Sequence, residues 1–389
     1  MSEVAQAPQL RFPEFIGEWD VTNFGNISSI KRGASPRPIS SPKWFDKDSS
    51  VGWVRISDVT KSKKYLKKTE QYLSEDGINR SRKVDKGNLI MSICATIGKP
   101  IYTNFNVCIH DGFIVFDSLS EDKGFIYYLL EKIQKKWYRY GQPGTQVNLN
   151  SDIVSSEIFS IPTKPEQQKI AAFLAAVDSK IEQLSKKQEL LGEYKKGSMQ
   201  QIFSQAIRFK ADDGSEFPDW EEKKLGGMID IVVDNRGKTP PVVKERNIPL
   251  IEVNAIGSKS IDYKKVSKFV TPETFKNWFR KYLNNGDILF STVGQTAVCS
   301  IYFDSVKAAI AQNIVGLRFS SEDFKFMYYL LTERKNNHKF KRIEMGAVQP
   351  SVKVSQMIHI DFKIPSFPEQ QKIANFLSSI DNKIEQVGK

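Results

Sequence analysis

The sequence has no long hydrophobic run. No apolar stretch approaches the roughly 18 residues that indicate a membrane-spanning helix, and the first 15 residues, MSEVAQAPQLRFPEF, have no hydrophobic signal core. Secretory signals require such a core near the N-terminus. We therefore expect a protein that is neither secreted nor embedded in a membrane, with the cytoplasm as its compartment.

Cysteine and histidine are also scarce. The chain has three cysteines without a CxxC pair, which predicts a reduced protein without a disulfide framework. It has three histidines, and they are scattered. Because the Cys108-x-His110 pair lacks a second pair of ligands, we expect it to be structural rather than to bind zinc.

The motifs of several enzyme classes are missing. There is no glycine-rich Walker loop, and the Pro-Pro pair at 240–241 is followed by two valines instead of the aromatic residue of adenine methyltransferases. Asp219, Glu221 and Lys223 stand too close together for a nuclease to place both carboxylates on one metal ion. We therefore expect a chain that is not an enzyme, with no metal site and no cofactor of its own.

Positive charge is abundant in both halves of the chain. The net charge is +12 and the isoelectric point is near 9.3, and several basic runs contain aromatic residues. An excess of base on both halves predicts two surfaces that meet a polyanion. Nucleic acid is favoured over a membrane, because no basic run carries a long apolar face. The runs are 61–68, 80–83, 132–139 and 334–342.

One stretch of sequence occurs twice. Residues 161–186 and 364–389 are identical at 17 of 26 positions, at a constant offset of 203, which shows an internal duplication. Each copy predicts a helix. Thr163 and Ser366 stand three residues before a glutamate, as in a capping box, and a proline follows in the first turn.

Apolar residues recur in both copies at alternating steps of four and three, which is the period of a coiled-coil seam. The first helix, at 163–204, would be a rod of roughly 60 Å at 1.5 Å per residue. Each stripe could simply pack on its own domain, but two narrow and nearly identical stripes favour antiparallel pairing with each other. The seam residues are Ile170, Leu174, Val177, Ile181, Leu184, Leu191, Ile373, Leu377, Ile380, Ile384 and Val387.

The segments between the helices predict two related mixed α/β domains. Strand-like runs at 52–57, 88–94 and 113–116 precede a helix at 125–133, and the same order returns at 248–253, 287–291, 314–319 and 324–331. The predicted fold class is α/β: two target-recognition domains separated by a long antiparallel two-helix coiled coil, with a pseudo-twofold repeat. The predicted limits are 1–160 and 211–363 for the domains, and 161–210 and 364–389 for the helices.

The repeated motif P-x-E-Q-Q-K-I-A-x-F-L-x-x-(V/I)-D-x-K-I-E-Q resembles the conserved regions of specificity subunits of type I restriction-modification enzymes. The bridge 202–221 and the entry Arg11–Glu14 with Trp19 are similar to the same family. The resemblance implies binding to double-stranded DNA and docking of two methyltransferase subunits, which modify adenine, on the conserved helices. It also implies that ATP-driven restriction subunits join the complex. S-adenosylmethionine, ATP and Mg²⁺ would belong to those partners.

Two dissimilar domains on a rigid spacer predict a bipartite, asymmetric DNA site with one half-site per domain. Candidate DNA contacts lie in polar or basic loops at corresponding places of the two halves, where arginine can read guanine and amides can read adenine. They are Lys31, Arg32, Arg37, Lys61, Lys63, Lys64, Arg80, Arg82, Lys83, Thr96, Gln142, Thr145, Gln146, Asn148, Arg236, Lys238, Thr239, Asn254, Lys259, Gln295, Thr296 and Gln349.

Two other hypotheses remain. The coiled coil could itself be the function, as a protein-interaction scaffold without sequence-specific DNA binding, or the chain could cleave or methylate DNA by itself. A steep salt dependence of DNA affinity would favour DNA binding over the scaffold hypothesis. Turnover by the purified chain would establish the second. The second helical segment spans about 22 residues against about 40 in the first, so completion of the pairing by the N-terminal residues or another chain is a further expectation.

Overall fold

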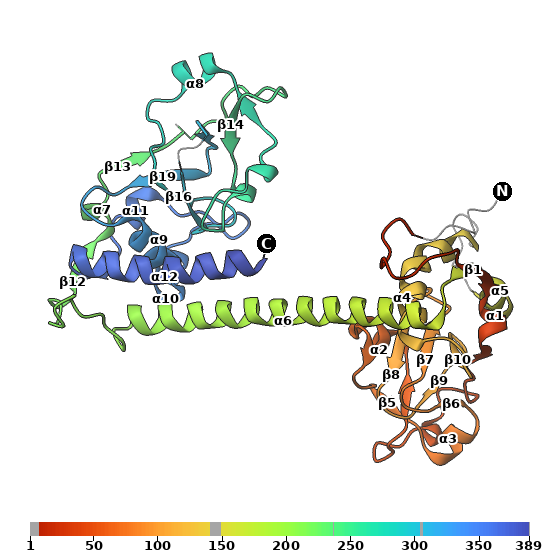
Figure 1. The fold of residues 1–389 in the computed structure, drawn as a ribbon. Helices are drawn as coiled ribbons and strands as arrows, with labels where there is room; N and C mark the ends of the chain where they lie inside the picture. Colours follow the sequence, from red (N-terminus) through yellow and green to blue (C-terminus); the bar gives the residue numbers. More distant parts are fainter. Residues whose placement is uncertain (1–7, 141–148, 236, 304–305, 389) are drawn as a thin grey trace. The chain divides into compact units, whose positions relative to one another are not determined.

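The computed structural model in Figure 1 describes residues 8–140, 149–235, 237–303 and 306–388. The chain divides into two compact units, Met1–Glu182 and Gln183–Lys389, called unit 1 and unit 2 below. The division falls inside the long helix α6 (Lys164–Phe203). Among the described residues, no helix is long and apolar enough to cross a membrane.

The described residues of unit 1 form three sheets. The first pairs β1 (Asp20–Asn23) with β11 (Ile158–Ile161), the second has the order β2-β10-β7-β8-β4, and the third has the order β5-β3-β9-β6. The strands of the last two sheets are β2 (Ser29–Arg32), β3 (Gly52–Val54), β4 (Tyr65–Leu66), β5 (Gln71–Tyr72), β6 (Arg82–Val84), β7 (Leu89–Ser92), β8 (Pro100–Thr103), β9 (Val107–Ile109) and β10 (Phe113–Asp117). The helices before α6 are α1 (Phe24–Ile27), α2 (Ile56–Lys61), α3 (Glu75–Asn79), α4 (Lys123–Ile133) and α5 (Ser151–Ser156), with 3₁₀ turns at Pro42–Trp44 and Gln134–Tyr140.

Among the described residues, unit 2 repeats this topology without counterparts of the edge strands β4 and β6. Its sheets have the orders β12-β20, β13-β19-β16-β17 and β15-β14-β18. The parallel pair β14·β18 and the antiparallel pair β14·β15 reproduce β3·β9 and β3·β5. The strands are β12 (Glu221–Lys224), β13 (Ile231–Val233), β14 (Ile248–Ile251), β15 (Phe269–Val270), β16 (Ile288–Ser291), β17 (Cys299–Ile301), β18 (Ala309–Ile310), β19 (Ile314–Arg318) and β20 (Asp361–Ile364). The helices are α7 (Leu225–Met228), α8 (Pro272–Trp278), α9 (Phe324–Thr332), α10 (Arg334–Lys341), α11 (Val354–Met357) and α12 (Phe367–Gly388), with 3₁₀ turns at Val253–Ala255 and Tyr263–Lys265.

The sequence therefore predicted the mixed α/β class, the repeat and most central elements correctly. The apolar runs around residues 90, 114, 289 and 315 are β7, β10, β16 and β19, and the two predicted amphipathic helices are α4 and α9. Several strands are shorter than predicted, among them β3, β7 and β14. β3 ends at Val54 because the carboxylate of Asp58 accepts a hydrogen bond from the backbone N–H of Arg55 and starts helix α2 at Ile56.

The duplicated E-Q-Q motif attaches each long helix to its own unit. In unit 1 the buried amide of Gln167 donates to the carbonyl of Pro162 (2.8 Å) and accepts from the backbone N–H of Asp122 (3.0 Å). Asp122 is in turn the N-cap of α4. Gln370 makes the equivalent bonds to Pro365 (3.0 Å) and Asp323 (2.9 Å) in unit 2. One amide thus fixes the start of the long helix against the N-terminus of α4 in unit 1 and of α9 in unit 2.

The predicted capping boxes are wrong, because their two glutamates accept hydrogen bonds from arginine side chains. Glu166 and Glu369 are buried, and each is held by a two-pronged contact from an arginine, Arg11 in unit 1 and Arg208 in unit 2. Arginine matches a carboxylate bidentately and replaces the reciprocal contact of a capping box. The hydroxyl of Ser366 is buried without a hydrogen-bond partner among the described residues.

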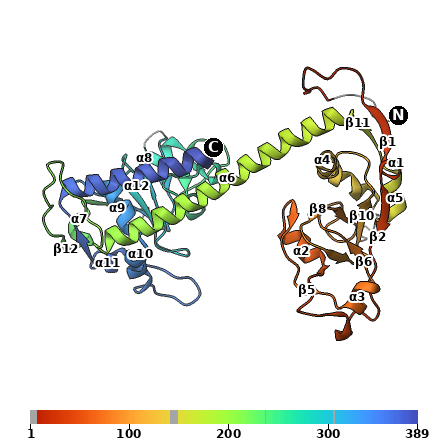
Figure 2. The same cartoon turned by 60° about the horizontal axis from the view of Figure 1, so that its bottom comes forward.

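In unit 2, α12 lies beside the C-terminal half of α6 and runs antiparallel to it, as Figures 1 and 2 both show. Lys195 of α6 contacts Asp381 of α12 at 2.5 Å, and Tyr194 lies against Phe376 with ring centroids 6.5 Å apart. Among the predicted seam residues of α12, Ile373, Leu377 and Ile380 are buried, and Ile384 and Val387 are half-buried.

The predicted seam along α6 is not continuously buried. Ile170, Leu174, Leu184 and Leu191 are half-buried, but Val177 and Ile181 are 39% and 57% exposed. In unit 2 the α6 residues that enter the core with the α12 stripe are Met199 and Ile202, which the predicted seam did not include. The α12 stripe shares that core with α9, so it packs largely on its own domain, which was the simpler of the two sequence interpretations.

Candidate nucleic-acid interface

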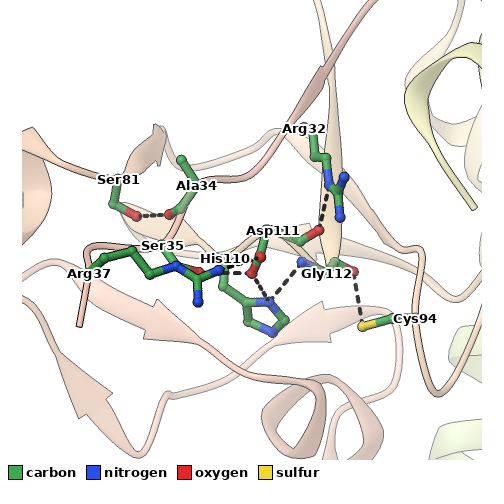
Figure 3. Close-up of polar contacts among 9 residues, drawn as sticks. All are labelled: Arg32, Ala34, Ser35, Arg37, Ser81, Cys94, His110, Asp111 and Gly112. Carbon is green, nitrogen blue, oxygen red and sulfur yellow. Dashed lines mark hydrogen bonds and ion pairs between the residues drawn. The ribbon is translucent and has the colours of Figure 1, made fainter. Parts of the chain in front are cut away.

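Two arginines, Arg32 and Arg37, contact Asp111 in unit 1 (Figure 3). Asp111 lies in the link between β9 and β10. Its backbone carbonyl accepts from Nε of Arg32 (2.7 Å), and its carboxylate accepts from the hydroxyl of Ser35 (2.9 Å) and from Nη2 of Arg37 (3.2 Å). Arg82 of β6 donates to the carbonyl of Arg32 (3.3 Å). The predicted contacts Arg32, Arg37 and Arg82 are therefore brought together.

Two glycines permit this close packing. A Cβ atom on Gly33 would lie 2.0 Å from the carbonyl oxygen of His110, and one on Gly112 would lie 2.4 Å from the imidazole and 2.5 Å from Sγ of Cys94. Such distances exclude any side chain. The Arg32–Gly33 step can therefore run directly against the β9–β10 link, as glycine allows where backbones approach closely.

The imidazole of His110 is neutral in this environment. Burial lowers its pKa, against the raising influence of Asp111. Its Nδ1 accepts a hydrogen bond from the backbone N–H of Gly112 (2.8 Å), so the ring proton is on Nε2. Burial raises the pKa of Asp111, but the hydrogen bond from Ser35 and the charge of Arg37 outweigh that effect. The net pKa is lowered, and the carboxylate is ionised.

These groups line a cavity of about 310 Å³, whose walls are Ser35, Arg37, Ile39, Trp53, Arg55, His110 and Asp111. Its polar groups offer guanidinium and imidazole N–H donors beside a carboxylate acceptor. Arginine binds the O6 and N7 edge of guanine, and an acidic side chain accepts from N4 of cytosine. The cavity is therefore chemically suited to the major-groove edge of a G·C pair.

The sequence analysis missed Trp53, Arg55, His110 and Asp111 as members of this site. The only signal in the sequence was the turn His110–Asp111–Gly112 between two apolar runs. That turn did not show which arginines would be opposite it. The pairing of β3 with β9, and the contact of the segment after β2 with the end of β9, bring them there.

Other predicted basic residues of unit 1 are exposed, and several have partners. Lys61 pairs with Glu70 (2.6 Å), Lys31 pairs with Asp117, and the guanidinium of Arg80 lies 5.8 Å from the ring centre of Trp44. Lys63 and Lys83 are exposed. Exposed ion pairs contribute little and exchange easily with phosphate contacts.

The turn after the central strand has the same construction in both units. The hydroxyls of Ser92 and Ser291 donate back to the carbonyls of Thr96 and Gln295. In unit 2 this turn is joined to the loop that carries Gln349, because the backbone N–H of Gly294 donates to the carbonyl of Pro350 (2.8 Å). Gln295 and Gln349, both exposed, therefore lie on adjoining loops. Two amides that can read adenine meet there.

The remaining predicted contacts of unit 2 lie on exposed loops. Lys238 is exposed, Thr239 donates to Gln312 (3.2 Å), and Asn254 donates to the carbonyl of Lys265 (3.3 Å). Five predicted contacts lie outside the described residues: Gln142, Thr145, Gln146, Asn148 and Arg236.

Three further predicted contacts have polar groups that bind within the chain, and their contact with DNA stays a prediction. Lys64 donates to Tyr128 (2.7 Å), and Lys259 donates to Ser378 of α12 (3.2 Å). Thr296 is buried, donates to Glu344 and accepts from Lys341 (2.7 Å). Each stands in a polar stretch of sequence, and only the tertiary packing shows that it points inward.

In the part of the chain that the structure describes, no three His, Cys, Asp or Glu side chains come close enough to hold a metal ion. The three cysteines form no disulfide. Burial raises the pKa of Cys108 to about 11 and that of Cys299 to about 12, so neither is a reactive thiolate.

Comparison with known proteins agrees with this architecture. The family model of the type I restriction modification DNA specificity domain matches this chain twice, at residues 16–191 and 218–389. The MjaVIII specificity subunit of Methanocaldococcus jannaschii is 25% identical over 97% of this chain and 88% of its own. The MjaIX specificity subunit of the same organism is 23% identical over 94% and 88%.

Solved structures show the same fold. The S subunit of a type I restriction-modification system from M. genitalium has a TM-score of 0.60 at 14% identity, covering 98% of this chain and 94% of that one. A chain from a study of assembly and conformational transition of the type I R-M system has a TM-score of 0.56 at 15% identity, covering 98% and 93%. The chain therefore belongs to the type I restriction-modification DNA specificity family, and its two copies of the specificity domain are two target-recognition domains.

Proposed function

We propose that the chain is the sequence-specific DNA-recognition subunit of a type I restriction-modification enzyme and binds a bipartite, asymmetric site with one half-site per domain. One observation carries the proposal: the same sheet topology occurs twice, while the loops at corresponding places differ in their polar side chains. A repeated scaffold with two dissimilar polar surfaces suits recognition of two different short sequences.

The two candidate surfaces differ in chemistry. In unit 1, Arg37 and Arg55 converge on a cavity with the carboxylate of Asp111, a set suited to a G·C pair. In unit 2, Gln295 and Gln349 occupy adjoining exposed loops, a set suited to adenine. The half-site of unit 1 then contains a G·C pair that this subunit reads, and that of unit 2 contains an A·T pair.

In this function the chain works inside a complex. Two methyltransferase subunits dock on the long helices and methylate adenine, and ATP-dependent restriction subunits complete the endonuclease. S-adenosylmethionine, ATP and Mg²⁺ are then used by the partner subunits, and this chain selects the DNA sequence to which the complex binds. The exposed apolar side chains of α6, among them Val177 and Ile181, are available for such docking.

The decisive experiment uses the chain reconstituted with its methyltransferase subunits. Methylated adenines in the source genome define the site, and a gel shift compares that duplex with scrambled half-sites over a range of salt. We expect preference for the mapped duplex and a log–log salt slope that reflects phosphate contacts. Absence of any sequence preference at every salt concentration would leave the scaffold hypothesis instead.

A matched pair of variants connects that experiment to the structure. Arg37→Ala removes a guanidinium from the cavity of unit 1, and Lys180→Ala removes one exposed charge from α6. The first should weaken binding to the mapped duplex by about 1–3 kcal/mol and leave scrambled duplexes almost unchanged. The second should leave sequence preference unchanged, and its effect on assembly with the methyltransferase subunits is measured separately by size exclusion.

A further inference from the structure

Unit 2 has a groove between the C-terminal half of α6 and helix α10, which lie close together in Figures 1 and 2. Its volume is about 760 Å³. None of its basic residues is among the DNA contacts that the sequence predicted, although α10 falls in the basic run at 334–342. A concentration of basic groups in a groove indicates a site for an anion. The six basic side chains that line it are Lys195, Lys196, Arg334, Lys335, His338 and Lys341.

Three of these cations have no counter-charge. Lys196, Arg334 and Lys335 are exposed, and the described residues include no ion-pair partner for any of them. The one acid among the described walls is Glu333, which is buried. Its carboxylate accepts from the backbone N–H of Asn336 (2.9 Å) and so caps α10. An anion in the groove would therefore bind side chains and not the end of the helix.

Two other lysines of the groove are bound within the chain. Lys195 of α6 contacts Asp381 of α12 (2.5 Å). Lys341, at the C-terminal end of α10, donates to the carboxylate of Glu344 (2.7 Å) and to the hydroxyl of Thr296 (2.7 Å). These contacts hold the two walls of the groove in place and leave its three free cations facing solvent.

Helix α10 is attached to the base-reading turn of unit 2 at two points. Lys341 binds Thr296, and the side-chain amide of Asn337 donates to the carbonyl of Ala297 (2.7 Å). Gln295, the exposed amide of that turn, directly precedes these two residues. The groove and the candidate reader of adenine are thus parts of one rigidly connected surface.

The spacing along α10 suits a DNA strand that flanks the bases being read. Arg334, His338 and Lys341 follow one another at steps of four and three, so they share a face of the helix. From Lys341 at the turn to Arg334, the helix extends roughly 10 Å at 1.5 Å per residue. The major groove is about 12 Å wide. A turn inserted in that groove therefore brings α10 to the backbone at its edge.

We propose that the groove between α6 and α10 binds the sugar–phosphate backbone of the DNA next to the half-site of unit 2, through Lys196, Arg334 and Lys335. This inference rests on the proposed function. The contacts carry no sequence information, but they fix the position in which Gln295 meets the bases. An acidic segment of a protein would match the charge as well, but it would gain nothing from attachment of α10 to the base-reading turn.

The test measures DNA binding by the chain reconstituted with its methyltransferase subunits. Arg334→Gln combined with Lys335→Gln removes two of the free cations. Loss of two phosphate contacts should make the log–log salt slope shallower by about 1 to 2 and weaken binding roughly 5- to 50-fold near 0.1 M salt. The loss should be the same for the mapped duplex and for every single-pair change in it, because phosphates are common to all sequences.

Two further double variants serve as controls. Lys224→Gln with Lys363→Gln removes two exposed lysines of β12 and β20 that do not line the groove. Screening by salt limits the effect of such remote charges, and affinity should change by less than about twofold. Arg334→Lys with Lys335→Arg exchanges the two side chains but keeps both charges, so the salt slope should stay that of the unaltered chain. A thermal melt of each variant establishes that it is folded.

Neutral phosphates show whether the backbone itself is the ligand. A methylphosphonate placed at one position of the mapped duplex removes a single charge. With the unaltered chain, two or three neighbouring substitutions beside one half-site should each weaken binding by several-fold. In the Arg334→Gln, Lys335→Gln variant these same substitutions should have little further effect, because their partners are gone. Substitutions beside the other half-site should keep their full effect.

Three results would overturn the proposal. The first is an unchanged salt slope in the Gln variant, and the second is a set of methylphosphonate effects that this variant leaves intact. The third is loss of the methyltransferase subunits from the Gln variant on size exclusion, because the groove would then bind an acidic protein surface. Absence of sequence preference in the unaltered complex would instead refute the proposed function. The two failures are therefore distinguishable.

Discussion

Asp111→Asn separates the two roles that charge plays at the cavity of unit 1. The carboxylate accepts from Ser35 (2.9 Å) and from Arg37 (3.2 Å), and an asparagine of the same shape can keep the bond from Ser35 through its carbonyl oxygen. The loop after β2 therefore stays anchored. What changes is one negative charge beside Arg37, whose side chain is 74% exposed.

Two effects on DNA binding should follow, a gain in overall affinity and a loss of discrimination between base pairs. Removal of an acid beside DNA strengthens attraction to phosphate, so the salt slope should become steeper by up to about 0.9 and binding to unrelated duplexes should tighten. Loss of the acceptor for cytosine N4 removes about 1–3 kcal/mol of discrimination, roughly 5- to 150-fold, at a single base pair. The variant should thus bind more DNA and choose less well.

The assay is anisotropy of the reconstituted complex on the mapped site and on every single-pair change within the half-sites, at several salt concentrations. The control is Asp117→Asn, which makes the same charge change in an exposed pair with Lys31 and leaves the cavity intact. We expect that control to keep its base preferences. Unaltered discrimination at every position in Asp111→Asn would refute base contact by this carboxylate, and a uniform loss across the half-site would show that it only supports the loop.

Three further outcomes are expected. Leu377→Ala should lower the free energy of unfolding of unit 2 by about 2–5 kcal/mol, because the side chain is fully buried. The matched Leu174→Ala should lower that of unit 1 by about half as much or less, since that leucine is only half-buried. Urea unfolding measures both changes. Burial lowers the pKa of His110 in the folded state, so stability should fall as pH drops through about 6.5, where the unfolded histidine takes up a proton, and His110→Gln should flatten that slope. An alkylating reagent should label the half-exposed Cys94 before the two buried cysteines, as mass spectrometry can measure. A cognate duplex should protect Cys94, since its Sγ lies 3.8 Å from the carbonyl of Gly112 beside the cavity.

The elements that sequence predicted well are those whose pattern is local. β7, β10, β16 and β19 are short apolar runs between turns, and such runs need no partner to be recognised. Helices α6 and α12 were visible because the duplication repeats their period. The family resemblance added the fold and function that no local pattern contained.

The candidate site was predictable only in part. Arg32 and Arg37 stand in a basic, glycine-containing loop, which local sequence shows. Asp111 is 74 residues beyond Arg37, and their contact depends on how two strand ends meet. Conversely, Lys64 and Lys259 stood in stretches that look solvent-facing, yet both point at the long helices. Sequence alone could not distinguish a lysine that binds phosphate from one that binds a tyrosine or a serine.

The duplicated motif is best explained by attachment rather than by pairing. Its glutamate binds an arginine from the entry of the same unit, and its first glutamine binds both the turn before the long helix and the N-cap residue of α4 in unit 1 or of α9 in unit 2. The two copies agree at those positions. They also agree at the seam pairs Ile170/Ile373 and Leu174/Leu377, but these pairs differ in burial. Since the glutamate and the first glutamine make equivalent contacts in each unit, the start of each long helix is attached to its own domain by the same chemistry. The loops are then free to diverge, because none of their residues contributes to that attachment. Gln167→Ala should therefore loosen one domain on its helix without altering the base preference of the other, which half-site-specific binding assays can measure.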